Sequence, residues 1–428
     1  MLTVARRPSE SFTLANGLQV VVLPSHRAPI VTQVVLYKVG GADETFGQTG
    51  VAHFLEHMMF KGTATVGPNE FSRIVSRSGG RDNAYTDFDV TAYHQTVAAD
   101  RLEMVMRMES DRMVNLRLAE SDLRTERQVV LEERRMRTDN VPSMLLDEAS
   151  REQLFGRHRP YGMPVVGYVD DVKRLTVGDL GAFYRRHYAP NNAVLIVAGD
   201  TTPEAVRKLA ERHYGPLARR TVPPRSRPSD GGKDLPQRVI RADARVVETR
   251  WERDYLAPSY RLGATEHAYA LSVLARLLGG SETSRLWRAL VSESRLALSA
   301  SASYGGASLG LSSFGFDVQP ARGTGVAAIE AAVGDQMKKL LDDGVTEEEV
   351  ERAQNRMLAQ TIYSQDSLAS GPRLYAAVLS TGGTVAEIDD WPKNVAAVTP
   401  AAVLAAARHV WRDDNAVTSL LTPVGGAQ

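Results

Sequence analysis

Short apolar runs alternate with stretches of helical periodicity along the first half of the chain. Runs rich in Val and Leu predict strands at residues 18–23, 31–37, 83–86, 90–97 and 193–198. Apolar residues at helical spacing predict helices at about 48–59, 69–78, 99–115 and 120–138. Strands and helices are mixed without strict alternation, and one strand pair has hairpin spacing. This pattern predicts the α+β class with an antiparallel sheet.

The second half of the chain repeats the pattern of the first. Residues 175–200 read LTVGDLGAFYRRHYAPNNAVLIVAGD and residues 398–423 read VTPAAVLAAARHVWRDDNAVTSLLTP. Thr176 aligns with Thr399 and Asn192 with Asn415, without a gap. Upstream, LAESDLRTERQVVLEE is echoed by VTEEEVERAQNRMLAQ. Two amphipathic helices can resemble each other by chance, but several matched segments in the same order favour a duplication.

The two halves are separated by TVPPRSRPSDGGKDLPQ, residues 221–237. Its prolines, paired glycines and alternating charges predict a solvated, semi-extended linker. The sequence therefore predicts two repeated domains, residues 1–220 and 238–428. Each is expected to be an antiparallel-rich sheet packed with helices.

Composition excludes several classes of protein. The 428 residues are 43% hydrophobic and 24% charged, as in ordinary globular proteins. Basic and acidic residues number 51 each, so no overall field attracts nucleic acid. The absence of cysteine excludes disulfides, thiolate zinc sites and cysteine nucleophiles. No apolar run is long enough to span a membrane. The N-terminal MLTVARRPSESFTLANG lacks the apolar stretch of a signal peptide, which leaves the cytoplasm and the periplasm open as the compartment.

The strongest chemical signal is HFLEH at residues 53–57. On a helix, His53 and His57 lie one turn apart on one face, within reach of one metal ion, and Glu56 lies near that face. The motif is the inverted counterpart of the H-E-x-x-H zinc helix. Two neutral imidazoles hold Zn²⁺ without cancelling its charge, and a neighbouring carboxylate can accept a proton from water. The alternative is an amphipathic helix with two packed histidines. It is the weaker interpretation, because the chain has only nine histidines.

A catalytic zinc site needs a third protein ligand. Glu126 and Glu133, in ERQVVLEERRMR, are seven residues apart and share one helix face. Glu132 competes with Glu133 from a position rotated by about 100°. A solvated face of Glu–Arg pairs would also explain this composition. The pattern alone does not choose among these glutamates.

Three segments together resemble the insulinase (pitrilysin) family of zinc peptidases, whose members include mitochondrial processing peptidase. They are GVAHFLEHMMFKGT, NAYTDFDVTAY and ERQVVLEE. The resemblance extends over the whole chain, and the two-half layout is that of short bacterial members. It implies a processing-peptidase-like fold and one Zn²⁺ per chain, bound by His53, His57 and Glu133, with Glu56 activating water. The glutamate in the family's third-ligand position lies 76 residues after the second histidine, which is Glu133 here. Glu126 falls on a family glutamate that orients a ligand.

The resemblance also implies a peptide-binding strand. In the family, the strand that carries Asn83 and Ala84 of NAYT is an edge strand that pairs with an extended substrate. An ordinary hairpin strand with Asn83 at a turn is the alternative.

One departure from the family concerns the second repeat. Active relatives carry a segment like REKRGLAY there, whose Arg and Tyr grip the substrate and stabilise the oxyanion. In SRLWRALVSESRLALSASASY, from Ser284 onward, the two positions hold Val291 and Leu298, and no other register restores the pair. The second repeat also lacks H-x-x-E-H, and Gln360 stands at the counterpart of Glu133. We therefore expect a heterodimer with a zinc-free homologue that carries the Arg/Tyr pair.

These observations favour a zinc endopeptidase subunit that cleaves extended peptides or unfolded segments. A peptide-binding or assembly subunit with a vestigial metal site is the alternative from another class. A zinc hydrolase acting on small molecules is a third.

Overall fold

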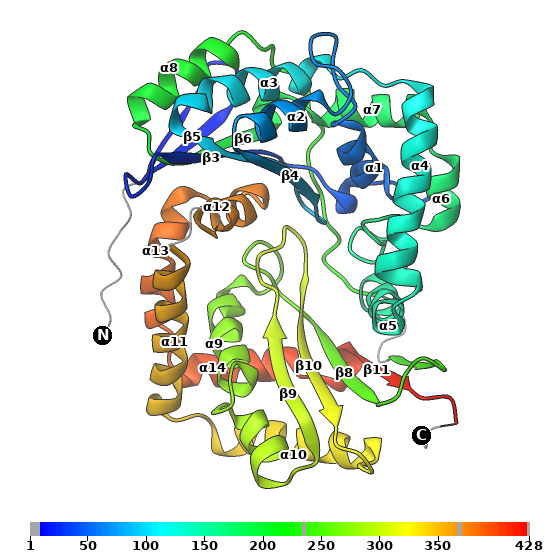
Figure 1. Cartoon of the computed structure of the whole chain (residues 1–428). Helices are drawn as coiled ribbons and strands as arrows, with labels where there is room; N and C mark the ends of the chain where they lie inside the picture. Colours follow the sequence, from blue (N-terminus) through cyan, green and yellow to red (C-terminus); the bar gives the residue numbers. More distant parts are fainter. Residues whose placement is uncertain (1–8, 233–236, 366–369, 426–428) are drawn as a thin grey trace.

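The computed structural model describes residues 9–232, 237–365 and 370–425, which form two mixed sheets surrounded by helices (Figure 1). The first sheet has the strand order β1-β2-β6-β3-β5-β4 and the second β7-β11-β8-β10-β9. The strands of the first sheet are β1 (Glu10–Thr13), β2 (Gln19–Pro24), β3 (Ile30–Tyr37), β4 (Arg81–Thr86), β5 (Thr91–Ala98) and β6 (Ala193–Gly199). Those of the second are β7 (Gln237–Ala242), β8 (Arg250–Ala257), β9 (Ala297–Tyr304), β10 (Ser312–Pro320) and β11 (Ala416–Thr422). In each sheet one pair is parallel and the others are antiparallel, which confirms the predicted class.

The helices follow the predicted periodicity closely. Those of the first half are α1 (Val51–Met58), α2 (Glu70–Arg77), α3 (Leu102–Asn115), α4 (Glu120–Arg134), α5 (Pro142–Arg151), α6 (Val169–Arg174), α7 (Val177–His187) and α8 (Pro203–His213). Those of the second half are α9 (Ala268–Gly279), α10 (Val326–Asp343), α11 (Glu347–Gln365), α12 (Ser370–Ser380), α13 (Val385–Ala396) and α14 (Pro400–Val410). The helix predicted at 120–138 ends as α4 at Arg134, where a wider π turn, Arg135–Asp139, continues it.

The two sheets have the same topology. From β2 onward the strands of the first sheet correspond in order to those of the second, with β2 matching β7, β6 matching β11, β3 matching β8, β5 matching β10 and β4 matching β9. The parallel pair is β2–β6 in one sheet and β7–β11 in the other. This match supports the duplication inferred from the repeated segments. The boundaries of the domains at residues 220 and 238 stay a prediction.

Each half contributes a helix that covers the sheet of the other half (Figure 1). Tyr375, Ala376 and Leu379 of α12 pack against Val21 and Val34 of the first sheet. In the other direction α5 contacts β7 and β11, and the hydroxyls of Ser150 and Ser419 lie 2.5 Å apart. The exchange places side chains of the second half beside the first sheet.

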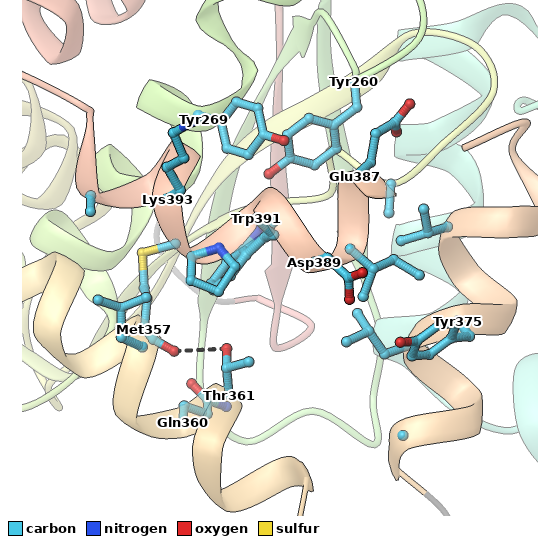
Figure 2. A pocket seen from close by; sticks show the side chains of 18 of the residues that line it. Tyr260, Tyr269, Met357, Gln360, Thr361, Tyr375, Glu387, Asp389, Trp391 and Lys393 are labelled. Carbon is cyan, nitrogen blue, oxygen red and sulfur yellow. Dashed lines mark hydrogen bonds between the residues drawn. The ribbon is translucent and has the colours of Figure 1, made fainter. Parts of the chain in front are cut away.

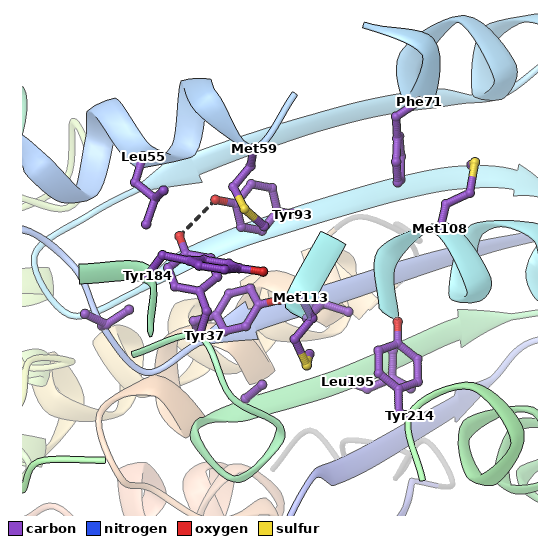
Figure 3. Close-up of a cluster of buried hydrophobic side chains, with 14 of the residues drawn as sticks. Tyr37, Leu55, Met59, Phe71, Tyr93, Met108, Met113, Tyr184, Leu195 and Tyr214 are labelled. Atoms are coloured by element: carbon purple, nitrogen blue, oxygen red, sulfur yellow. Dashed lines mark hydrogen bonds between the residues drawn. The ribbon is translucent and has the colours of Figure 1, made fainter. Parts of the chain in front are cut away.

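The main core of the first half is rich in aromatic and methionine side chains (Figure 3). Tyr37, Tyr93 and Tyr188 are fully buried, and the hydroxyls of Tyr93 and Tyr188 lie 2.9 Å apart. Buried Arg112 forms a 2.6 Å ion pair with Glu109 and lies over the ring of Tyr93, 4.3 Å from its centroid. Pairing satisfies the two charges inside the core.

The segment between the halves differs from the solvated linker that its composition predicts. It has no regular secondary structure over residues 221–232, residues 233–236 lie outside the described residues, and Gln237 begins β7. The side chain of Arg227 is only 3% exposed and contacts Asp43 and Asp89, each at 2.8 Å. Arg225 contacts the same two carboxylates. Two buried carboxylates of the first half thus hold the side chains of Arg225 and Arg227 out of solvent, whereas half of residues 221–232 are exposed as expected of a linker.

Candidate metal centre

Helix α1 carries the H-x-x-E-H motif. Two residues that precede the helix, Gly50 and Glu44, fix where it begins. Gly50 has a φ of 85°, and a Cβ there would lie 2.7 Å from the carbonyl oxygen of Val166. The carboxylate of buried Glu44 accepts hydrogen bonds from the backbone N–H groups of Gly50 at 2.7 Å and Ala52 at 2.8 Å. These bonds satisfy donors that the first turn of a helix leaves without partners. The motif thus lies on a helix with a defined beginning.

Three predicted ligands converge at the contact of α1 with α4. The Nε2 atom of His57 lies 3.1 Å from Oε2 of Glu133, and Nε2 of His53 lies 3.6 Å from the same oxygen. The imidazole rings are 4.9 Å apart between centroids. The three side chains can each offer one ligand atom within 4.8 Å of the others. We call His53, His57 and Glu133 the metal cluster.

The donor set and its spacing fit a zinc ion. Two ligand atoms bound to one tetrahedral Zn²⁺ at about 2.1 Å are about 3.4 Å apart, close to the separations in the metal cluster. The Nδ1 atom of His53 is buried without a hydrogen-bond partner among the described residues. Two imidazoles and one carboxylate also match the ligand set of catalytic zinc sites, which leave a fourth position open.

The structure separates the three candidate glutamates of α4. Glu133 joins the metal cluster, and its Oε1 contacts Arg137 at 2.6 Å. Glu126 accepts a hydrogen bond from Nδ1 of His57 at 3.1 Å, with its other oxygen 2.5 Å from Lys61. Glu132 points away, is half exposed and pairs with Arg135. A carboxylate on Nδ1 leaves Nε2 of His57 facing the cluster, which is how carboxylates orient metal-binding histidines.

Burial and neighbouring charges shift the pKa values in this cluster. Burial, reinforced by His57, lowers the pKa of His53 to about 4. Burial alone would lower the pKa of His57, but hydrogen bonds to Glu126 and Glu133 outweigh it and raise that pKa to about 9. The hydrogen bond to His57 holds the pKa of Glu133 at about 2. Two carboxylates therefore concentrate negative charge where a cation would bind.

Glu56 lies beside the metal cluster and is connected to the edge strand. Its Oε2 accepts a 2.6 Å hydrogen bond from the hydroxyl of Thr86, the last residue of β4. Burial raises the pKa of Glu56, whereas the bond from Thr86 lowers it. A raised pKa suits a carboxyl group that accepts and returns a proton near neutral pH.

Asn83 and Ala84 lie in the middle of β4, which is the outermost strand of the first sheet. The edge position agrees with the expected peptide-binding strand. Of the alternative, the place of Asn83 in a turn is wrong, whereas β4 does pair with β5 as an antiparallel neighbour. Asn83 pairs with His94 and Ala84 with Tyr93 of β5. Among the described residues no strand pairs with the other edge of β4, which a peptide strand could therefore join. The backbone N–H of Ala84 donates a 2.9 Å hydrogen bond to Oδ1 of Asn83, which such a peptide would replace.

Four contacts of the site were not predicted from the sequence. They involve Glu44, Lys61, Thr86 and Arg137. Lys61 and Arg137 each stand four residues after a metal-cluster residue, so helical spacing gave a weak signal for both. Thr86 belongs to the NAYT segment. No local pattern pointed to Glu44.

The second half carries no equivalent cluster within its described residues. Val291 packs against the core of the second half, and Leu298 on β9 is exposed. Gln360, on α11, bonds to Arg276 instead of a histidine. The structure thus brings no Arg/Tyr pair to these two positions.

A cavity of about 1220 Å³ lies between α9, α11, α12 and α13 of the second half. Tyr260, Tyr269 and Trp391 line one side of it, and Tyr375 lies across from them (Figure 2). None of the metal-cluster residues lines this cavity. Its size therefore does not mark the site of the metal chemistry.

The matches to known proteins agree with this site. The insulinase (peptidase family M16) model matches residues 19–161, and the model described as peptidase M16 inactive domain matches residues 174–357. The chain belongs to the insulinase family of peptidases, as the sequence motifs indicated. The metal cluster lies within residues 19–161, the part of the chain that the insulinase model matches.

Individual relatives extend the likeness over nearly the whole chain. The zinc protease PqqE of Helicobacter pylori is 31% identical over 417 residues, 97% of this chain and 93% of that protein. The crystal structure of a protease from Helicobacter pylori covers 98% of this chain and 100% of its own, with 29% identity and a TM-score of 0.85. A putative M16-like peptidase from Alicyclobacillus acidocaldarius has a TM-score of 0.86 at 21% identity, with 98% and 100% covered, which shows the same fold.

No helix within the described residues has the length and apolar character needed to cross a membrane.

Proposed function

We propose that this protein is the catalytic subunit of a zinc-dependent endopeptidase that cleaves peptides or unfolded segments bound as an extended strand. The observation that carries the proposal is the joining of three groups at one place. Glu56 shares α1 with the two histidines of the metal cluster, and its hydrogen bond from Thr86 connects it to the end of β4. A relative over 97% of the chain bears the name zinc protease.

One Zn²⁺ per chain would be held by His53, His57 and Glu133. When bound, zinc acts as a Lewis acid that lowers the pKa of water and polarises a carbonyl group. Glu126 holds Nδ1 of His57 and thereby orients the Nε2 atom of that ring. Lys61 neutralises the second oxygen of Glu126.

Glu56 performs the proton transfers. Its carboxylate accepts a proton from the attacking water and delivers it to the nitrogen of the leaving amine. Thr86 keeps Oε2 of Glu56 fixed by its hydrogen bond, so the carboxylate faces the end of β4. A peptide paired with the free edge of β4, along Asn83 and Ala84, would present its backbone beside Glu56.

The direct test compares wild-type protein with Glu56→Gln. The variant should retain zinc, because Glu56 is not one of the proposed ligands, and lose about 10²–10⁴-fold in hydrolysis of a quenched peptide. Near wild-type turnover in the variant would remove Glu56 from the mechanism. Hydrolysis of small esters without any hydrolysis of peptides would favour a small-molecule hydrolase.

A partner subunit is the second part of the proposal. Because Val291 and Leu298 replace the Arg/Tyr pair, the protein alone should bind zinc and cleave slowly. An oxyanion donor typically contributes about 10²–10³ in kcat. Activity should rise steeply when a zinc-free homologue with the pair is added, and mutation of that pair should abolish the gain. Full turnover by the single chain, with no gain from any homologue, would contradict the shared site.

A peptide-binding or assembly subunit with a vestigial metal site is the second candidate. The match of residues 174–357 to a model described as an inactive domain favours it. It predicts peptide binding with no hydrolysis in the presence of zinc and of any homologue.

A further inference from the structure

A second cavity, of about 510 Å³, lies beside β4 on the face of the sheet turned away from α1. Side chains alternate between the two faces of a strand. Ala84 packs against the main core of the first half, whereas Tyr85 packs against the cluster that contains α12. Asn83 and Arg81 have the parity of Tyr85, and all three line the cavity.

The cavity has a basic lining assembled from both halves of the chain. Arg81 of β4, His94 of β5 and Arg373 of α12 line it. Asp82 is the one acidic residue among the described residues of its lining, and its carboxylate accepts a hydrogen bond from Ser72 of α2 at 2.5 Å. Because burial and the nearby Arg373 lower the pKa of His94, the positive charge comes from the two guanidinium groups. We call Arg81, Asn83, Tyr85, His94 and Arg373 the basic pocket.

Among the described residues, the nearby carboxylate of Asp87 forms no ion pair with Arg81 or Arg373. Asp87 lies in the turn after β4, and its Oδ1 accepts a 2.8 Å hydrogen bond from the backbone N–H of Phe88. Arg373 and Arg81 are both exposed. Their guanidinium groups are thus accessible to a ligand that enters along the strand.

A peptide strand on the free edge of β4 places every second side chain over the basic pocket. Directly opposed residues of neighbouring strands lie about 5 Å apart, so a side chain there is adjacent to Arg81, Asn83 or Tyr85. The intervening side chains point to the other face, where Thr86 and Glu56 lie. A carboxylate is the group that two guanidiniums recognise best, through charge-assisted hydrogen bonds.

We propose that the basic pocket binds an acidic side chain of the peptide substrate, and that Arg373 of the second half sets this preference. The inference rests on the proposed peptidase function and adds the class of substrate. It gives the second half, which carries no metal cluster within its described residues, a direct part in substrate selection.

The experiment uses the full chain, with its homologue if activity requires one, and quenched peptides that differ at a single position. Glu, Gln and Lys are compared in turn at each position around the cleaved bond. At the substrate position whose side chain faces the basic pocket, the peptide with Glu should have a higher kcat/KM than the peptide with Lys. The two adjacent positions should show no such preference, because their side chains point to the other face of the sheet. Arg373→Glu should reduce the Glu-to-Lys ratio by at least about threefold, and Arg81→Glu should change it in the same direction.

Lys393→Glu is the matched control, since Lys393 is an exposed cation of α13 that lines the larger cavity and not the basic pocket. It should leave the ratio unchanged. If Lys393→Glu changed the Glu-to-Lys ratio as much as Arg373→Glu does, the preference would come from the overall charge of the protein, and the proposal for the basic pocket would be wrong. Unchanged ratios in both Arg373→Glu and Arg81→Glu would overturn it as well.

Failure of the peptidase proposal is measured separately. Binding of the same peptides to Glu56→Gln, followed by fluorescence anisotropy, reports on the basic pocket without turnover. Stronger binding of the Glu peptide than of the Lys peptide, with the order reversed in the double variant Glu56→Gln/Arg373→Glu, would support the basic pocket even if no hydrolysis occurs. If the protein hydrolyses peptides but shows no charge preference in hydrolysis or in binding, the proposed role of the basic pocket is wrong and the peptidase proposal still holds.

Discussion

The hydroxyl of Thr86 donates a 2.6 Å hydrogen bond to Oε2 of Glu56. These two residues are 30 positions apart in the chain and belong to different elements, β4 and α1. This bond, together with the packing of α1 against β4, connects the edge of the first sheet to the helix of the metal cluster. A peptide on the edge strand and the proposed base would therefore keep a constant geometry.

Replacing Thr86 with Val should lower kcat/KM about tenfold, because a hydrogen bond to a charged group is lost while the shape is kept. Thr86→Ser keeps the hydroxyl and should retain most of the activity. Peptide hydrolysis and zinc content are measured for both. Equal activity of the Val and Ser variants would show that the bond does not position Glu56.

Glu133→Gln should lower zinc occupancy sharply, because a neutral amide is a much poorer ligand than a carboxylate. Glu132→Gln is its matched control, one residue away on the half-exposed face of α4 where it pairs with Arg135. The zinc content of dialysed protein gives the answer. Full zinc occupancy in Glu133→Gln together with loss of zinc in Glu132→Gln would show that Glu132, and not Glu133, is the third ligand.

Arg227→Met should reduce the free energy of unfolding by about 3 kcal/mol, since it removes one of the two arginines that pair with buried Asp43 and Asp89 among the described residues. Arg352→Met removes an exposed arginine that pairs with Glu348 one helical turn away, and should change stability by less than about 0.5 kcal/mol. Urea unfolding compares them. A cost as small for Arg227 as for Arg352 would mean that the segment between the halves is solvated after all.

Glu252 on β8 gives a prediction for the pH dependence of stability. Burial, with a contribution from Asp147, raises the pKa of Glu252 to about 8, although Arg250 opposes this. An acid whose pKa is raised by folding binds more protons in the folded state. Its stabilising effect is therefore complete below its unfolded pKa of about 4.5 and is lost as the pH rises towards 8.

Glu252→Gln cannot ionise, so the variant should lose less stability than wild type between pH 5 and pH 8. Melting temperatures at the two pH values measure the difference. Glu248→Gln, a change at an exposed glutamate that bonds to Gln319, should follow the wild type. If Glu252→Gln and wild type lost stability in parallel, Glu252 would not titrate in this range.

The sequence by itself determined the local elements and the chemistry of the first half. Strand and helix periodicity located β3, β5 and α3 to within a few residues, because neighbouring side chains must share a face to reach the core. Helical spacing put His53 and His57 on one face for the same reason. The repeated segments indicated two similar halves, and the two sheets have matching strand orders.

Tertiary structure alone decided which residues from distant parts of the chain meet. Spacing left Glu132 and Glu133 open, and only the packing of α4 against α1 turns Glu133 towards the histidines. The burial of Arg227 and the placement of Arg373 beside β4 likewise depend on contacts across the two halves. Periodicity reports which face of an element is buried and says nothing about what covers it, so these partners appear only when the chain has folded.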